Sequence, residues 1–419
     1  MANHEIRQSS GAEPGFFYGY FVVAAVCLVM VVVYGVHYAF GVFFKPVLTD
    51  LGWTRAMTSG AFSLSWFVHG LLGIVMGGLN DKLGPRIVLT ICGFLFGLGY
   101  VLMSQVGAVW QLYLFYGVII GTGLGGVFVP LTSTIARWFV ARRSMMTGIA
   151  AAGIGIGTLV APLAANWLIS AYDWRLSYII LGIVVFVVVV SAAQFLKRDP
   201  ARVGRRPYGE NSGERESKSA TEGLSLKEAV YTRQFWLAFI MFFCFGFGLY
   251  AIVVHIAPHA TDLGISTTVA ASILAAVGAA SIVGKVVFGY VADRIGNRQV
   301  YVIGFILLSA SLFWLVPATE VWGLYLFAVV FGLAYGGLSS SQPPLVAWLF
   351  GIRSHGLIYG VSSNGFTLGG AIGPFLVGYI FDVTASYQSA FWVCAAIAII
   401  GLILTLVLRP IRSEIGKIG

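Results

Sequence analysis

The sequence predicts an all-α membrane protein in which twelve transmembrane helices form two pseudo-symmetric six-helix halves. Composition is the first reason: of the 419 residues, 58% are hydrophobic and only 10% are charged, and the mean hydropathy is +0.90. Soluble domains carry about 25% charged residues. Most of this chain is therefore expected to lie in a lipid bilayer. The other two reasons are a series of long apolar runs and an internal repeat.

The apolar runs have the length of membrane-spanning helices. A helix needs about 20 mostly apolar residues to cross a bilayer, and such runs are too long for the strands of a membrane barrel. Helices are therefore the expected spanning elements. Twelve runs meet this requirement, at residues 17–44, 56–79, 87–105, 110–135, 144–170, 175–196, 235–257, 268–291, 299–317, 321–348, 355–380 and 389–408.

The distribution of basic residues predicts the orientation of these helices. With both termini in the cytoplasm, the outer loops hold three of the 25 Lys and Arg residues (Lys45, Arg55 and Arg175), Lys285 lies within a run, and the other 21 lie in cytoplasmic segments. Cytoplasmic loops carry an excess of Lys and Arg. We therefore expect a multi-pass plasma-membrane protein, in a bacterial inner membrane, with cytoplasmic termini. The net charge of +9 follows from this placement and does not indicate nucleic-acid binding.

One long polar segment, residues 197–233, interrupts the apolar runs. It contains nine Lys or Arg and six acidic residues, and little that could form a core. We expect a cytoplasmic linker, partly disordered, between an N-terminal half (1–196) and a C-terminal half (234–419). Within it, Ser225-Leu-Lys-Glu228 resembles a capping box and predicts a short surface helix before the seventh run.

The two halves repeat each other at a constant offset of 212 positions. Asp81 corresponds to Asp293, and the segment 49–52 corresponds to 261–264. The other pairs are Tyr38 with Tyr250, Pro46 with Pro258, Gly77, Gly84 and Arg86 with Gly289, Gly296 and Arg298, and Gly148, Gly153, Gly157 and Pro162 with Gly360, Gly365, Gly369 and Pro374. Two similar six-helix halves with a binding site between them are typical of a transporter.

Twelve helices, the duplicated halves and the Gly–Asp–Gly–Arg motif after the second and eighth runs resemble the major facilitator superfamily over essentially the whole chain. A second stretch, Trp138-Phe-Val-Ala-Arg142-Arg143 followed by Gly148, Gly153 and Gly157, is similar to the fifth-helix signature of monocarboxylate transporters and of the related oxalate–formate antiporters. Gly15-Phe-Phe-Tyr-Gly19-Tyr20 resembles bacterial members of that branch. The resemblance implies a secondary active transporter, not an enzyme.

In the superfamily, the duplicated motif joins the two halves on the cytoplasmic side when the site faces outward. The sequence places Asp81 and Asp293 just past the cytoplasmic ends of helices 2 and 8. By the resemblance, Asp81 would contact the start of helix 11 and Asp293 the start of helix 5. The expected gating latch consists of Asp81, Arg86, Asp293, Arg294 and Arg298.

Lys285 is the charged residue that the sequence places inside a membrane-spanning run. It precedes Asp293 by eight residues, or about 12 Å along a helix, so it lies near the centre of a hydrocarbon layer about 30 Å thick. Each Asp and Glu falls in a loop, a helix end or a tail. A lysine in lipid needs a partner or a wet cavity. We therefore expect Lys285 to bind a substrate that carries negative charge.

The family resemblance supports an anion site at this position. Monocarboxylate transporters carry an aspartate and an arginine four residues apart in helix 8, and the arginine binds the substrate carboxylate. The matching residues here are Ser281 and Lys285, so the usual proton-carrying carboxylate is replaced. The oxalate–formate branch adds a cation in helix 11, whereas run 355–380 has no Lys or Arg. One cation suits one carboxylate better than two.

Other polar side chains inside the runs are candidates to contact the anion or to relay a proton. Helix 7 lines the central cavity in this superfamily, and a histidine titrates near physiological pH, which favours His255 for both roles. His37 lies toward the outer end of the first run. The substrate-binding candidates are Lys285, Tyr335, Ser281, His255, Tyr34, Tyr38, Tyr250 and Asn364, and the proton-coupling candidates are His255, Lys285 and His69.

We expect a monomeric, proton-coupled carrier of a small monocarboxylate such as lactate or pyruvate, working by alternating access. Anion exchange of the oxalate–formate type, without net proton movement, is the alternative. Exporters of cationic drugs commonly use intramembrane carboxylates, which the runs lack, and nothing resembles the catalytic residues of an enzyme. The four cysteines lie in apolar runs at spacings that match no zinc or redox motif, so we expect no metal and no cofactor.

Overall fold

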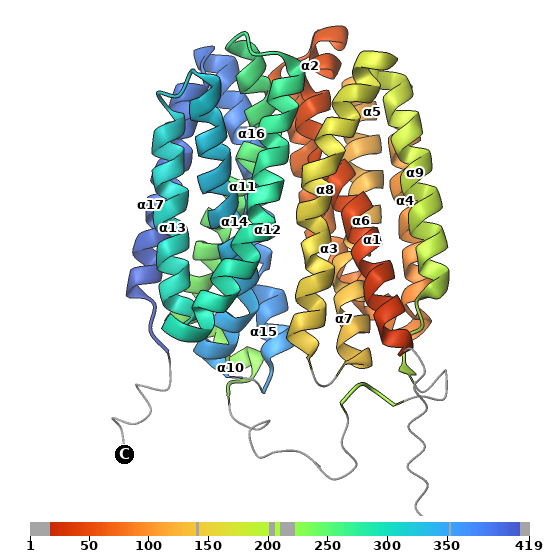
Figure 1. Cartoon of the computed structure of the whole chain (residues 1–419), viewed down its shortest axis with the longest axis vertical. Helices are drawn as coiled ribbons and strands as arrows, with labels where there is room; N and C mark the ends of the chain where they lie inside the picture. The colour runs from red at the N-terminus through yellow and green to blue at the C-terminus, as the bar shows by residue number, and fades with distance from the viewer. Residues whose placement is uncertain (1–16, 140–141, 201–205, 210–222, 352, 411–419) are drawn as a thin grey trace, which may run out of the picture.

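The computed structural model describes residues 17–139, 142–200, 206–209, 223–351 and 353–410. These residues form long helices that run roughly along one axis (Figure 1). Helices α1–α9 lie on one side and α11–α17 on the other, and we call them the N-terminal and C-terminal bundles. The end of the molecule at which α10 lies, together with the start of α1, is called the linker end.

Each of the twelve predicted runs is helical in the structure. Nine runs correspond to one helix each, and the runs 17–44, 110–135 and 355–380 are each divided into shorter helices. The N-terminal bundle contains α1 (Tyr18–Tyr38), α2 (Phe40–Leu51), α3 (Arg55–Leu83), α4 (Pro85–Met103), α5 (Val109–Leu112), the π-helical segment η1 (Tyr113–Ile120), α6 (Gly121–Gly125), α7 (Phe128–Trp138), α8 (Arg143–Ala171) and α9 (Trp174–Phe195). After α10 (Leu226–Val230), the C-terminal bundle contains α11 (Arg233–Asp262), α12 (Thr267–Ile295), α13 (Asn297–Leu315), α14 (Val321–Phe350), α15 (His355–Ser362), α16 (Asn364–Thr384) and α17 (Tyr387–Val407).

Eleven of the described helical spans are long and apolar enough to cross a membrane by length and composition. Helix α3 corresponds to the remaining run and has 29 residues. It is rich in Ser and Gly and packs against α16 of the other bundle, where the Ser63 hydroxyl accepts a hydrogen bond from the Phe375 backbone N–H at 3.2 Å. A helix that is covered by protein on this face needs less apolar surface than one surrounded by lipid.

Two glycines fix the linker ends of α3 and α12, and they correct the predicted position of the aspartates. Gly84 and Gly296 have φ values of 85° and 93°, a conformation that favours glycine. The helices therefore continue to Leu83 and Ile295. Asp81 and Asp293 consequently lie inside the last helical turns and not past the helix ends as predicted. Their side chains are outside the described part of the structure.

The predicted capping box is confirmed. The Ser225 backbone N–H donates to Glu228 Oε2 at 2.7 Å, and Ser225 Oγ accepts from the Glu228 N–H at 3.3 Å. These hydrogen bonds lower the pKa of the Glu228 carboxyl. The described ends of the linker segment are attached to the bundles, because Leu224 N–H donates to Phe350 O and Tyr208 N–H donates to Trp138 O, both at 2.9 Å. Partial disorder was predicted for the linker 197–233, and residues 201–205 and 210–222 of it lie outside the described residues.

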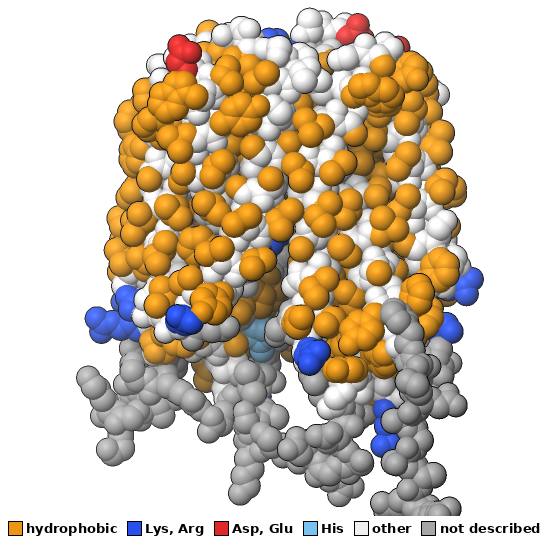
Figure 2. Space-filling model, in the orientation of Figure 1, with side chains coloured by type: hydrophobic (Ala, Val, Ile, Leu, Met, Phe, Trp, Pro, Cys, Tyr) orange, Lys and Arg blue, Asp and Glu red, His pale blue; other side chains and the backbone are white. Residues whose placement is uncertain are grey.

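The surface has the charge pattern of a membrane protein. Hydrophobic side chains cover the long face that Figure 2 shows, Lys and Arg gather toward the linker end, and Asp and Glu lie at the opposite end. Between the two bundles, the surface is hollowed toward the linker end (Figure 2).

Candidate functional site

Lys285 projects from α12 into the contact between the two bundles. Its Nζ donates a hydrogen bond to the Ala151 carbonyl of α8 at 3.2 Å. The ammonium also lies 5.6 Å from the centroid of the Tyr335 ring on α14, within the range of a cation–π contact. The side chain is half-buried. The positive charge therefore sits at the interface between the bundles, as an anion site there requires.

Small residues bring the surrounding helices close to this lysine. A Cβ added to Gly278 of α12 would lie 2.6 Å from the Leu159 backbone nitrogen of α8. A Cβ added to Gly336 of α14 would lie 2.7 Å from the Lys285 backbone nitrogen. Glycine is needed at both positions because the facing atoms belong to backbone and cannot move aside cheaply. The close approach of α14 places Tyr335, the residue before Gly336, beside Lys285.

Four of the predicted tyrosines gather around the same point. The hydroxyls of Tyr38 and Tyr250 lie 3.1 Å apart, and these residues come from opposite bundles and are related by the 212-residue repeat. The Tyr34 ring contacts Tyr38, with 6.0 Å between centroids. Tyr335 lies near each of these three tyrosines. The structure thus brings Lys285, Tyr335, Tyr34, Tyr38 and Tyr250 together.

Ser281 and Asn364 are placed differently. Ser281 is fully buried, and its hydroxyl donates to the Gly278 carbonyl of its own helix at 2.7 Å. A role in anion binding would require this hydrogen bond to break. Asn364 lies at the start of α16 and lines a groove of about 240 Å³ with Phe67, Gly70, Leu71, Thr367 and Leu368. This groove lies between α3 and α16 and does not include Lys285.

His255 is held apart from Lys285. It is fully buried, its Nε2 lies 2.8 Å from the Pro374 carbonyl, and its Nδ1 lies 3.1 Å from the Tyr387 hydroxyl. A carbonyl only accepts hydrogen bonds, so Nε2 carries the hydrogen and Nδ1 accepts from Tyr387. Both ring nitrogens are therefore engaged with α16 and α17. Contact with the anion, as predicted, would need the ring to leave both partners.

Cross-bundle ion pairs close the end opposite the linker. Asp262 of α11 accepts from Lys45 of α2 at 3.0 Å and from Arg55 of α3 at 2.6 Å. The Arg55 side chain is only 10% exposed and also donates to the Tyr387 hydroxyl. Asp382 accepts from the first two backbone N–H groups of α3, at 2.9 and 2.7 Å, where a carboxylate complements the helix dipole. We call Lys45, Arg55, Asp262, Asp382 and Tyr387 the opposite-end cluster.

The repeat shows how this cluster arises. Asp50, the counterpart of Asp262, pairs with Arg175 inside the N-terminal bundle at 3.2 Å. The position equivalent to Arg175 in the C-terminal bundle is Tyr387. Asp262 therefore has no arginine at that position of its own bundle, and Arg55 of the other bundle pairs with it instead. An intra-bundle pair in one half is replaced by a cross-bundle pair in the other.

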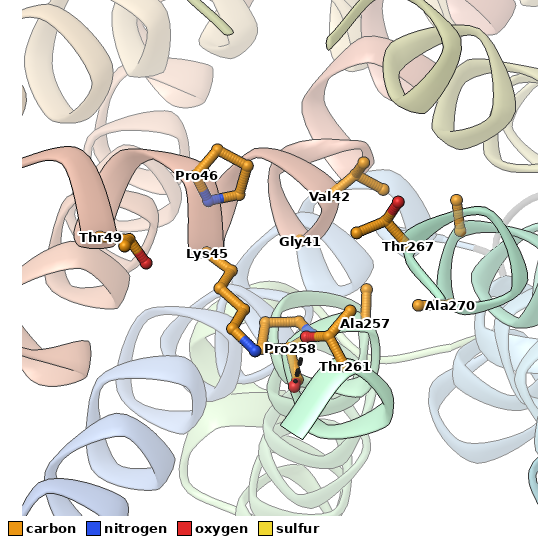
Figure 3. Close-up of a pocket in the computed structure, with 11 residues that line it drawn as sticks. Gly41, Val42, Lys45, Pro46, Thr49, Ala257, Pro258, Thr261, Thr267 and Ala270 are labelled. Atoms are coloured by element: carbon orange, nitrogen blue, oxygen red, sulfur yellow. Dashed lines mark hydrogen bonds between the residues drawn. The ribbon is translucent and has the colours of Figure 1, made fainter. Parts of the chain in front are cut away.

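A groove of about 260 Å³ lies beside the cluster, between α2, α11 and α12. Figure 3 shows Lys45 reaching from α2 toward Pro258 and Thr261 of α11. The repeat-related residues Pro46 and Pro258 both line this groove, as do Thr49 and Thr261. The groove is lined mainly by apolar atoms and does not contain Lys285.

Comparison with known proteins decides the family. The sequence model of the Major Facilitator Superfamily matches residues 26–260 and 256–417. The chain belongs to the Major Facilitator Superfamily. This superfamily member is accordingly a multi-pass membrane transporter and not an enzyme.

Several relatives match nearly the whole superfamily member. Monocarboxylate transporter 13 of Rattus norvegicus is 27% identical, over 92% of this chain and 87% of that protein. Monocarboxylate transporter 7 of Homo sapiens is 26% identical, over 98% and 91%. The oxalate:formate antiporter of Oxalobacter formigenes is 26% identical, over 99% and 98%.

A solved structure supports the fold assignment. A bacterial homologue of the human lysosomal transporter Spinster, in an inward-facing and occupied conformation, matches with a TM-score of 0.74 at 16% identity, over 94% of this chain and 97% of that chain. At this identity the likeness shows the superfamily fold alone. In the present chain, the described cross-bundle hydrogen bonds extend from the opposite-end cluster to Lys285, and the surface is hollow toward the linker end.

The arginines of the expected latch contact their own bundles in this conformation. Arg86 Nε donates to Gln194 Oε1 of α9 at 2.6 Å, and Arg298 donates to the Leu406 carbonyl of α17 at 2.6 Å. Arg294 donates to the Tyr290 hydroxyl within α12. The expected partners of Asp81 and Asp293 involve side chains outside the described part. The latch therefore stays a prediction.

The sequence reasoning missed the opposite-end cluster. Lys45 and Arg55 were recognised only as basic residues on the side that the positive-inside pattern leaves poor in them. Two features of the sequence could have indicated the cluster. These are the presence of Lys45 and Arg55 on the side that is otherwise poor in basic residues, and the aspartate repeated at 50 and 262. Trp66 was not among the predicted site residues, and its ring packs at a tilt against Tyr250 with 4.1 Å between ring centroids.

Proposed function

We propose that this superfamily member carries small monocarboxylates across the membrane together with a proton. One observation carries the proposal: the Lys285 ammonium lies between the bundles, and among the described residues no carboxylate lies within 4.0 Å of it. A charge held between helices inside the membrane needs a compensating partner. A substrate carboxylate would supply it, and the Tyr335 and Tyr38 hydroxyls would donate to the same anion.

The size and charge of the site support a monocarboxylate. Lysine presents one compact charge with three donors, and one of them now donates to the Ala151 carbonyl. The aromatic rings around it favour a ligand with a short apolar part, as in lactate or pyruvate. The relatives named monocarboxylate transporters agree with this substrate class.

The transport cycle that we propose uses the two halves as moving units. The halves are residues 1–196 and 234–419, joined by 197–233, with the linker end in the cytoplasm. Opening of the opposite-end cluster and closure of the hollow would expose Lys285 to the other side. The expected latch of Asp81, Arg86, Asp293, Arg294 and Arg298 would hold that second state, and the unit would act as a monomer.

Anion exchange is the second candidate, because the oxalate:formate antiporter matches the chain over nearly its full length. The experiment that separates the two is a panel of monocarboxylates and dicarboxylates in proteoliposomes, with and without an imposed pH gradient. Symport predicts net lactate uptake that is driven by an acidic exterior. Uptake that requires an internal anion and ignores the gradient would instead establish exchange.

A further inference from the structure

His37 on α1 is a buried histidine with one free ring nitrogen. The ring is fully buried and stacks on Phe62 and Tyr116, with centroid distances of 4.8 and 5.6 Å. Its Nδ1 lies 3.2 Å from the Tyr116 oxygen, and the Tyr116 hydroxyl also donates to the His37 carbonyl at 3.3 Å. When the hydroxyl hydrogen is directed to this carbonyl, the Tyr116 oxygen is free to accept from Nδ1–H, and the inference uses this tautomer. Nε2 is then a bare acceptor.

A donor side chain that also lacks a partner lies near this acceptor. His37 Nε2 and Trp66 Nε1 are both buried, and neither has a hydrogen-bond partner among the described residues. The two rings are 5.7 Å apart at 62°. Trp66 can only donate, and His37 Nε2 can here only accept. One water that accepts from Trp66 and donates to His37 would satisfy both atoms, as buried waters commonly do.

We propose that His37 takes up the coupled proton through a water held between its Nε2 and Trp66; this inference rests on the proposed function. A hydronium ion delivers its proton to Nε2, which leaves an imidazolium and a neutral water, while Nδ1–H stays hydrogen-bonded to Tyr116. His255 offers no such atom, because Tyr387 and Pro374 occupy both of its nitrogens. His69 Nδ1 is also buried without a partner in the described part of the chain, and its ring lies 5.0 Å from that of Trp66, so His69 is the rival proton site that the test must separate from His37.

Contacts connect His37 to the anion site. The His37 ring lies 6.3 Å from that of Tyr38, Tyr38 lies near Tyr335, and the Tyr335 ring lies beside Lys285. Trp66 in turn packs at a tilt against Tyr250, the hydrogen-bond partner of Tyr38. The proton site is therefore separate from the lysine but shares its aromatic wall.

No negatively charged side chain of the described residues pairs with the His37 ring, so a protonated His37 would have no counter-ion from the protein. The titratable groups that face it are His69 from α3, Tyr116 from η1, Tyr100 from α4 (bonded to the Val36 carbonyl), Tyr38 from α1 and, behind Tyr100, Tyr178 from α9. No carboxylate, lysine or arginine of the described chain is hydrogen-bonded to the ring. A bound carboxylate supplies the missing negative charge, so anion and proton binding favour each other.

The test compares His37→Asn with His69→Asn and His255→Asn in proteoliposomes. Asparagine keeps an N–H near the position of Nδ1 and lacks Nε2. With one proton per lactate, an inward gradient of one pH unit gives about tenfold accumulation in the parent protein. We expect His37→Asn to show no accumulation, so that the internal and external lactate concentrations become equal. Lactate counterflow at equal pH should persist in this variant. Both control variants should still accumulate lactate, whatever their rates, because the accumulation ratio does not depend on rate.

Other results would overturn the inference. Full accumulation by His37→Asn, loss of accumulation in a control variant alone, or a parent protein that exchanges lactate but ignores the gradient would each do so. Absence of lactate counterflow in the parent would instead sink the proposed function. If His37→Asn does not insert, Trp66→Phe replaces it: we expect a shifted pH midpoint for uptake, and an unshifted midpoint overturns the inference.

Discussion

At the scale of single residues, the site combines one charge with several hydroxyls. Lys285 replaces the arginine that the family resemblance predicts, and a lysine gives a point charge in place of a planar fork. Its present acceptor is a backbone carbonyl, which a substrate carboxylate can displace because the charged hydrogen bond is stronger. The Tyr335 ring makes a cation–π contact with the ammonium.

Removal of the Tyr335 hydroxyl tests its contact with the anion. Tyr335→Phe keeps the ring beside Lys285 and loses one hydrogen bond, so we expect the KM for lactate to rise about tenfold, equivalent to about 1.4 kcal/mol. Initial rates of uptake in proteoliposomes measure this change. The matched control is Tyr379→Phe on α16, where the side chain is 53% exposed. An equal KM in both variants would show that the hydroxyl does not contact the substrate.

At the scale of helices, glycine contacts determine how closely the bundles approach. The α8–α12 contact extends from the hydrogen bond between Asn166 and Thr268, at 3.2 Å, to that between Lys285 and Ala151. Gly278 lies within this contact and Gly336 holds α14 against α12. A movement that opens the opposite end must separate α8 from α12 near Gly278, whereas the α12–α14 contact lies inside one bundle.

A larger residue at Gly278 should therefore favour the separated arrangement. In Gly278→Val, the Cβ would lie 2.6 Å from backbone nitrogen of α8, which disfavours the present state. We expect faster labelling of a cysteine at position 267, which lines the opposite-end groove, by an impermeant maleimide in a background without native cysteines. Gly289→Val on the same helix is the control, because no atom lies within 4 Å of its Cβ. Equal labelling of the two variants would contradict the packing argument.

At the scale of the whole molecule, the opposite-end cluster holds one arrangement of the two bundles. Its ion pairs join α2 and α3 to α11, and Asp382 of α16 binds the start of α3. The Arg55 side chain is only 10% exposed, and loss of one partner from such a pair is costly because it leaves an uncompensated charge. The cluster therefore stabilises the state in which the hollow faces the linker end.

Asp262→Asn tests this role. The change removes both cross-bundle ion pairs, and a loss of about 1–2 kcal/mol would shift the balance between the two states by about 5–30-fold. We expect the distance between two spin labels, one at the start of α3 and one at the end of α11 beside the opposite-end cluster, to lengthen. Asp50→Asn is the control from the repeat, because its ion pair with Arg175 stays within one bundle. The same distance change in both variants, or in neither, would argue against the cluster as a gate.

The sequence was sufficient for the fold because each helix leaves a local record of about 20 apolar residues, and because the 212-residue offset relates the halves. It also led to Lys285 and the tyrosines, since polar groups in lipid are conspicuous. It could not show that His255 is held by Pro374 and Tyr387, which are 119 and 132 positions away. Nor could it show that Arg55 pairs with Asp262 across 207 positions. Such contacts depend on how the bundles meet.

Lactate counterflow by Lys285→Ala tests the central claim, that this lysine binds the transported anion. The charged hydrogen bond is worth about 1.5–3 kcal/mol, so its loss should raise the KM at least about tenfold or abolish counterflow, while the variant inserts and elutes as the parent does. Counterflow needs no pH gradient, so the result does not depend on the proton site. Lys285→Ala with the counterflow rate and KM of the parent protein would contradict the account.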